Sequence, residues 1–212
     1  MNWDSRKYKV YTWKNWMVLH WIFNPGLAIN ELIFGQRVPK LSLEDLESDK
    51  PRYERSYVPC PHCNTLHDAR TWTPNNGLAF KNWFGLYCTS CGKIIPCVLN
   101  VWSFIILLLS SPLWIWFARP LKARWLKQQP QRYAHAQVDM RNPFDGKNWL
   151  SSALAWGGFM FLLMGIIIPV FQGEVLDTKN LAVSLLFWAL AGLAFGYTMK
   201  LFLGRKNPSV KN

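Results

Sequence analysis

The sequence predicts a mainly α-helical membrane protein that carries a small β-rich domain, and three features support this prediction. Apolar residues gather in three long stretches, 94–118, 150–171 and 181–203. The intervening segment 36–93 has an ordinary polar composition, so the hydrophobicity is unevenly distributed. Four of the five cysteines form two Cys-x-x-Cys pairs inside that polar segment.

Two of the apolar stretches are long enough to cross a bilayer. Ala153–Phe171 is uncharged over 19 residues and Leu181–Thr198 over 18, and a membrane-spanning helix needs roughly 18 to 20 such residues. We therefore predict transmembrane helices at 149–171 and 181–203. The connection 172–180 is so short that the two helices must form an antiparallel hairpin. Between Leu150 and Thr198, Asp, Glu, Lys, Arg and His occur only in the connecting loop, which argues against ion or proton transport through the hairpin.

Small residues on these helices suggest close helix packing. The candidates share small-xxx-small spacing, which lets two helix backbones approach each other; they are Gly157, Gly158, Gly192 and Gly196. The same pattern serves packing within one chain or against another subunit, and both alternatives stay open here.

The third apolar stretch, 96–118, is uncharged and also long enough to span. It contains Ser110-Ser111-Pro112, and serine followed by proline is a typical helix start. This segment is therefore expected either to cross the membrane or to enter and return as a re-entrant segment.

Residues 1–35 are basic and rich in tryptophan. Trp13, Trp16 and Trp21 fall on one face of a predicted helix, which favours a helical leader at the membrane interface. The alternative is a helix that packs on the polar domain.

A second helix is expected to start with Asn24 as N-cap and Pro25 at its first position. The following residues, 36–55, are charged and contain two prolines, which predicts a linker arm.

The cysteine pairs are Cys60/Cys63 and Cys88/Cys91, with 24 residues between them. Each Cys-x-x-Cys turn directs two thiolates to one point, and two turns complete the tetrahedral four-sulfur shell that zinc accepts. Asn64 and Gly92 hold the same place after each pair, and both residue types tolerate a positive φ.

Short β-type runs at 56–58, 79–83 and 85–87 accompany the cysteines, and residues 56–95 resemble a four-cysteine zinc ribbon. The resemblance implies two metal knuckles on β-hairpins and a structural zinc ion without an open position for water. Iron also binds two such knuckles, but no partner cofactor motif accompanies them, so zinc is favoured over iron. His62 and His67 are alternative ligands beside a shell that four cysteines already fill.

The net charge is +12, and it lies almost wholly outside the apolar stretches. Basic residues in the loop 119–148 and in the tail 204–212 favour contact with anionic lipid headgroups, and they also suit nucleic acid.

Lysine and arginine mark the cytoplasmic side of a membrane, so the loop and tail are expected inside and 172–180 outside. The five cysteines indicate a reducing compartment, so we expect the zinc domain on the cytoplasmic side of a bacterial inner membrane. If residues 94–118 cross the membrane once, the zinc domain would instead face outward, with its thiolates protected by the metal.

These features favour a non-catalytic accessory or scaffold subunit of a membrane complex, whose zinc ribbon and basic loop dock other membrane subunits. An alternative is a membrane-tethered nucleic-acid or ribosome binder that stacks bases on its aromatic residues; these are Trp72, Phe80, Trp83, Phe84 and Tyr87. A second alternative is an enzyme acting on lipid or protein with His67, Asp68 and Arg70 as its acid/base group. A purely structural polar turn is the simpler interpretation of those three residues.

Overall fold

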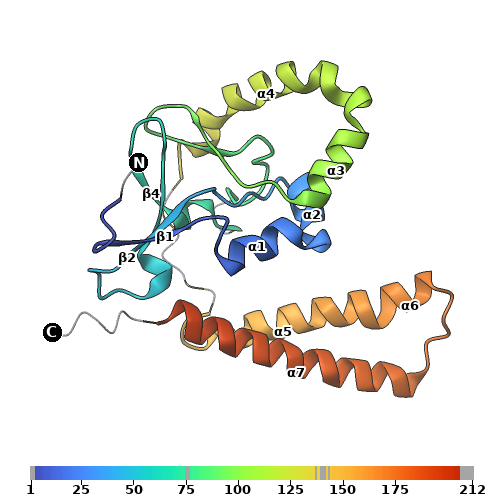
Figure 1. Cartoon of the computed structure of the whole chain (residues 1–212). Coiled ribbons are helices and arrows are strands. Elements are labelled where there is room, and N and C mark those ends of the chain that lie inside the picture. Colours follow the sequence, from blue (N-terminus) through green and yellow to red (C-terminus); the bar gives the residue numbers. More distant parts are fainter. Residues whose placement is uncertain (1–2, 75–76, 137, 139–141, 143, 206–212) are drawn as a thin grey trace. The chain divides into compact units, whose positions relative to one another are not determined.

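The computed structural model describes residues 3–74, 77–136, 138, 142 and 144–205, and it divides into two compact units (Figure 1). The first unit comprises residues 1–49 and 54–140 with 208–212, and the second comprises 50–53 and 141–207. Residues 206–212 of the predicted basic tail lie outside the described residues.

A four-stranded antiparallel sheet organises the first unit. Its strands follow one another in chain order, β1 (Tyr8–Tyr11), β2 (Ser42–Asp45), β3 (Ser56–Pro59) and β4 (Leu66–Asp68). The register pairs Val10 with Leu43, and Leu43 with Tyr57. The structure thus differs from the expected helical leader and linker arm, since β1 and β2 lie in those segments. Aromatic and β-branched residues in β1 and the buried Leu43 in β2 favour strands there.

A second, two-stranded sheet pairs β5 (Leu86–Tyr87) with β6 (Ile94–Ile95). Short 3-10 turns, η1 (Arg52–Glu54) and η2 (Ala69–Trp72), lie in the connections. The expected β run 79–83 is not a strand, because Lys81 has a φ of 60°. Its backbone N–H instead donates to the Phe34 carbonyl at 2.7 Å. The core between the sheets consists of Val58, Cys60, Leu86, Cys88 and Ile95.

Two short helices connect β1 to β2: α1 (Trp16–Phe23) and α2 (Pro25–Leu32). The predicted start of the second helix is confirmed, because the Asn24 side chain accepts from Gly26 N and Pro25 occupies the first turn. The tryptophans of the leader differ in solvent exposure. Trp13 and Trp16 are exposed, whereas Trp21 is buried against the rest of the first unit.

The third apolar stretch forms α3 (Val101–Leu109) and the start of α4 (Ser111–Tyr133). The two helices meet at a bend of 104°, at the Ser-Ser-Pro site that predicted a helix start. α4 continues to Tyr133, so much of the expected basic loop is helical, and Trp125 and Tyr133 are buried.

The second unit is a helical hairpin. α5 (Asn148–Met160), the π-helical segment η4 (Phe161–Ile167) and α6 (Ile168–Phe171) form one continuous helix of 24 residues. It is followed by α7 (Thr178–Leu203), with 26 residues. Both helices are long and apolar enough to cross a membrane.

Glycines allow close packing inside this hairpin. A Cβ atom added to Gly157 would lie 2.5 Å from the Trp188 carbonyl oxygen, and one on Gly192 would lie 2.5 Å from the Ala153 carbonyl oxygen. Gly196 faces Ala153 equally closely, whereas Gly158 has no such neighbour within 4 Å. Three of the four predicted packing glycines therefore lie between α5 and α7, and the fourth does not.

Candidate metal centre

The first cysteine pair occupies a tight turn between β3 and β4. Cys60 N donates to the Thr65 carbonyl at 3.0 Å, and Asn64 N donates to the Cys60 carbonyl at 3.0 Å. Asn64 has a φ of 60°, which confirms the positive φ expected after this pair. These bonds hold Cys60 and Cys63 on one side of the turn.

The second cysteine pair repeats this arrangement between β5 and β6. Cys88 N donates to the Lys93 carbonyl at 2.9 Å, and Gly92 N donates to the Cys88 carbonyl at 2.9 Å. Gly92 has a φ of 71°, again as expected. The two knuckles thus share one hydrogen-bond pattern, although one extends the four-stranded sheet and the other the two-stranded sheet.

The four sulfur atoms of the knuckles converge. All lie within 4.8 Å of one another, with Cys60 Sγ 3.7 Å from Cys91 Sγ and Cys63 Sγ 3.6 Å from Cys88 Sγ. A regular tetrahedron of sulfurs around zinc, with Zn–S bonds of about 2.3 Å, has edges of about 3.8 Å. Cys60, Cys63, Cys88 and Cys91 are therefore arranged to hold a metal ion, and the arrangement is compatible with zinc.

The thiols differ in their surroundings. Burial raises the pKa of Cys60, and it raises the pKa of Cys88 to about 12. Hydrogen bonds from the side chain and backbone of Thr65 lower the pKa of Cys63 to about 6. A buried thiol becomes a thiolate at neutral pH only beside a compensating positive charge, which a bound metal ion supplies.

His67 lies beside the four-sulfur shell. Its Nε2 atom is 3.1 Å from Cys88 Sγ, and burial lowers its pKa, which favours the neutral ring. A neutral imidazole N–H can donate to a metal-bound thiolate, so His67 is placed to support a ligand. His62, the other alternative ligand, is exposed on the first knuckle.

Asp68 and Arg70 form a local structural pair. The Asp68 carboxylate caps η2 by accepting from Arg70 N at 2.9 Å, and it also accepts from the guanidinium at 2.8–3.3 Å. His67 is directed at Cys88 and Asp68 at Arg70. Within the proposed acid/base group, His67 is therefore engaged separately from the Asp68–Arg70 pair.

Three of the five aromatic residues considered for base stacking contribute to internal packing. Trp72 Nε1 donates to the Tyr133 hydroxyl at 2.8 Å, Tyr87 packs on Tyr133, and Phe84 packs on Trp125. These three residues hold α4 against the two sheets that carry the knuckles (the metal-bearing domain), whereas Phe80 and Trp83 are 37% and 39% exposed.

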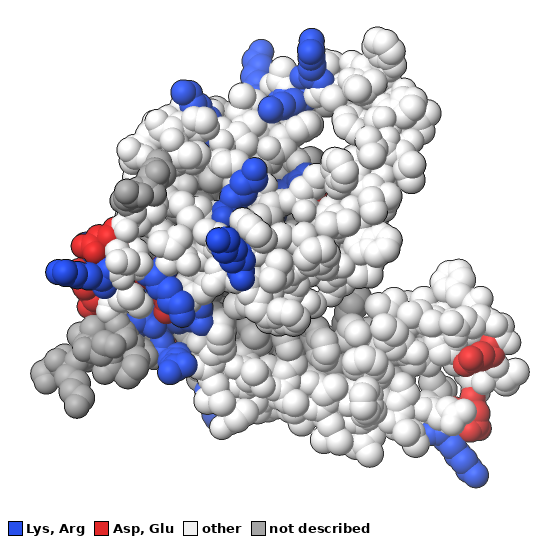
Figure 2. All heavy atoms as spheres, viewed as in Figure 1, with Lys and Arg blue, Asp and Glu red and all other residues white. Residues whose placement is uncertain are grey.

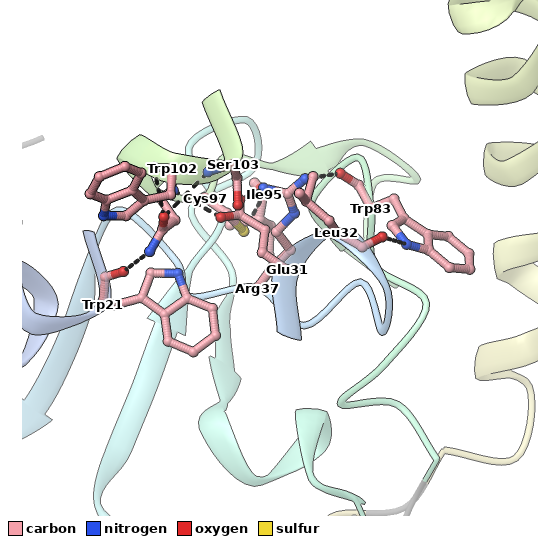
Figure 3. Close-up of polar contacts among 10 residues, drawn as sticks. Trp21, Glu31, Leu32, Arg37, Trp83, Ile95, Cys97, Trp102 and Ser103 are labelled. Atoms are coloured by element: carbon pink, nitrogen blue, oxygen red, sulfur yellow. Dashed lines mark hydrogen bonds and ion pairs between the residues drawn. The ribbon is translucent and has the colours of Figure 1, made fainter. Parts of the chain in front are cut away.

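A buried polar cluster, which sequence reasoning did not assemble, lies at the base of α3 (Figure 3). Glu31 of α2 is 0% exposed and forms an ion pair with Arg37. Its other carboxylate oxygen accepts from Asn100 N at 2.8 Å. The Asn100 side chain donates to the carbonyls of Trp21 at 2.6 Å and Asn24 at 2.8 Å. Glu31 thus connects α2 to the first turn of α3.

Further contacts extend this cluster. Arg37 donates to the Trp83 carbonyl, and the Trp83 indole donates to the Leu32 carbonyl at 3.1 Å. Trp102 donates to the Phe23 carbonyl at 3.0 Å. The signal in the sequence was a single acid within an otherwise apolar helix and an asparagine before the third apolar stretch, but their pairing depends on the fold.

Fold and site together define a helix-rich protein with two candidate membrane helices, a small antiparallel β region and a four-cysteine candidate metal site. A family model described as "Domain of unknown function (DUF8250)" matches residues 11–107. The matched range contains all four cysteines, the Glu31–Asn100 contact and nearly all of α3. No curated protein and no solved structure matches the chain.

Proposed function

We propose that the protein is a non-catalytic accessory or scaffold subunit of a membrane protein complex. One observation is its main support: the buried charged side chains described in the first unit form ion pairs. Glu31 pairs with Arg37, Asp68 with Arg70, and Glu44 with Arg55 at 2.8 Å, with the last two side chains 7% and 5% exposed. Such pairs stabilise one arrangement of the fold, and they leave few buried ionisable side chains for acid/base chemistry.

In this proposal the metal is a structural zinc ion. Four cysteine thiolates close its coordination shell, so no position is open for a water nucleophile or a substrate. The ion would join two small sheets that share a core of only a few apolar side chains, which suits a domain too small to be stable without such a link.

The α5–α7 hairpin is proposed to cross the membrane, with the metal-bearing domain on the cytoplasmic side. One end of the hairpin carries basic side chains, and the other end carries two acidic side chains and one basic one. Lys147, Lys200 and Arg205 lie at one end, and Glu174, Asp177 and Lys179 lie at the other. The visible surface between them is uncharged (Figure 2). This asymmetry favours the first end inside and the second outside.

The docking surface for the partner is proposed to include the exposed basic side chains of α4. Arg119, Lys122, Arg124 and Lys127 all face solvent on this helix, while Trp125 holds it to the domain. A fixed row of cations of this kind suits an acidic surface of a neighbouring subunit or anionic headgroups.

Mild detergent extraction of the tagged protein, followed by mass spectrometry of whatever co-purifies, tests the proposal. We expect a stable membrane-protein partner that is lost when Lys122 and Lys127 are both replaced by Glu, while metal content is retained. Asp68→Asn should leave the partner bound. Recovery of RNA in place of protein would favour the nucleic-acid alternative. Loss of the cellular function in Asp68→Asn with the assembly intact would favour an enzyme.

A further inference from the structure

Helices α3 and α4 together are fixed to the same unit at both ends, and their apolar part, residues 101–118, forms an arch. At the first end, Asn100 caps α3 and binds the α1–α2 junction through the Trp21 and Asn24 carbonyls. At the second end, the Trp125 indole donates to the Lys81 carbonyl at 2.7 Å, and Arg132 donates to the Gly77 carbonyl at 3.1 Å. The segment between them leaves the metal-bearing domain and returns to it.

The side chains at the bend of the arch are apolar and exposed. Leu109 is 77% exposed, Leu113 79% and Trp116 80%, which places them among the most exposed large apolar residues of the first unit. No lysine, arginine, aspartate or glutamate occurs from Ile94 to Ala118. The surface over α3 and the bend is accordingly uncharged in the space-filling view (Figure 2). An exposed apolar patch of this extent marks an interaction surface.

The polar groups at the bend are satisfied inside the arch. The Ser110 hydroxyl donates to the Ile106 carbonyl at 2.6 Å. The Trp114 indole donates both to the Leu107 carbonyl at 3.2 Å and to the Ser110 hydroxyl at 3.1 Å. Proline at position 112 contributes no N–H. In water, solvent molecules would form hydrogen bonds with these polar groups. In hydrocarbon, the polar groups of an interrupted helix need hydrogen-bond partners within the protein. The bend therefore has the hydrogen bonding expected of a segment surrounded by lipid.

The limbs of the arch have the length of one leaflet. α3 has 9 residues and is thus about 14 Å long at 1.5 Å per residue, about half of the roughly 30 Å hydrocarbon core. The apolar part of α4 is equally short, because Arg119 follows Ala118. Neither limb crosses a bilayer alone, and the bend of 104° keeps them from forming one straight span.

We propose that the arch, residues 101–118, is a re-entrant membrane insertion that enters and leaves one leaflet from the side of the metal-bearing domain. Its occupant is lipid: acyl chains surround Leu109, Leu113 and Trp116, and anionic headgroups contact Arg119 and Lys122. The inference deepens the proposed function, because it rests on the membrane location proposed there.

The position of α1 and α2 follows from the same geometry. The first end of the arch is bonded to the carbonyls of Trp21, Phe23 and Asn24, so the α1–α2 junction lies at the depth where α3 enters the bilayer. Trp16 and Phe23 are exposed on α1, and Ile33 is exposed directly after α2. This apolar face suits the headgroup boundary, where tryptophan is favoured.

Site-specific thiol labelling of the full-length protein in its native membrane tests the arch. Single cysteines replace Lys40 before the arch, Leu109 at its bend, Lys127 after it and Thr178 in the hairpin loop, each in a Cys97→Ser background. A membrane-impermeant maleimide is applied from either side, in intact cells and in inverted vesicles. Measuring the metal content of each variant shows that the knuckles remain loaded and protected.

We expect Lys40→Cys and Lys127→Cys to react from the same side, and Leu109→Cys to react from neither side until detergent is added. Reaction of the first two from opposite sides would show a span and overturn the proposal. So would labelling of Leu109→Cys in intact membranes as rapidly as Lys127→Cys. The Thr178→Cys probe reports separately on the hairpin: labelling from the Lys127 side would contradict the proposed hairpin topology, whereas the arch is decided by the other three probes.

Discussion

The carboxylate of Glu31 accepts a hydrogen bond of 2.8 Å from the backbone N–H of Asn100, across 69 positions of sequence. The same carboxylate neutralises Arg37, so one buried acid joins α2, the segment after it and the first turn of α3. Both residues fall inside the range matched by the family model. The leader, the metal-bearing domain and the arch are therefore parts of one folded body.

Replacing Glu31 by Ala should destabilise the protein by about 3–5 kcal/mol, because it leaves the Arg37 guanidinium largely buried without its counter-charge. Thermal unfolding of the purified protein in detergent measures this. Glu47→Ala provides the matched control, since Glu47 pairs with Lys7 at 3.8 Å with a side chain that is 66% exposed. An exposed pair of this kind contributes about 0–1 kcal/mol. Equal effects of the two substitutions would contradict the structural role of Glu31.

Each chain should bind one zinc ion, which Cys88→Ser removes and Cys97→Ser does not. Cys97 lies outside the four-sulfur group, and its thiol is directed to the Ile95 carbonyl at 3.6 Å. Elemental analysis of the protein purified without added metal decides the point. Iron in place of zinc, or full metal content in Cys88→Ser, would refute the assignment.

Gly192→Leu should separate the hairpin helices, because any side chain there meets the Ala153 carbonyl and the Gly157 backbone. Gly158→Leu should be tolerated, because a Cβ atom there has no such neighbour within 4 Å. Disulfide cross-linking between cysteines introduced at Gly165 and Ser184 reports helix proximity, because a Cβ atom added to Gly165 would lie 2.6 Å from Ser184 Oγ. Metal content should stay unchanged in both variants. Unimpaired cross-linking in Gly192→Leu would show that the glycine contact is dispensable.

The thiol of Cys97 should react slowly with alkylating reagents near neutral pH. Burial raises its pKa to about 11, so its reactive thiolate is scarce until the pH approaches that value. The unfolded thiol ionises near its ordinary value of 9.0, so this group lowers the stability of the folded state as the pH rises from about 9 to about 11. The melting temperature of the metal-loaded protein should therefore fall more across this range than that of Cys97→Ala. Identical pH profiles would contradict the raised pKa.

Local patterns in the sequence were sufficient for several parts of the structure. The two apolar helices, the cap at Asn24 and the positive φ of Asn64 and Gly92 depend on neighbouring residues, so they could be predicted. The pairing of β1 with β2 and the contact of Glu31 with Asn100 could not, because each joins segments distant in sequence. Trp21 illustrates the limit: helical spacing grouped it with Trp16, but the binding of Asn100 to its carbonyl places it in the interior.

The way in which the two knuckles close has a consequence for the level of the protein in the cell. Each knuckle closes through bonds within its own short turn, so each can form before a metal ion arrives. In the proposed structural role, the ion then fastens two sheets that share no strand pairing among the described strands. Chains synthesised during zinc shortage would hold both turns but expose the apolar residues between the sheets, such as Leu86 and Ile95. Since cellular proteases remove incompletely closed domains, the level of the protein in the cell should follow the zinc supply.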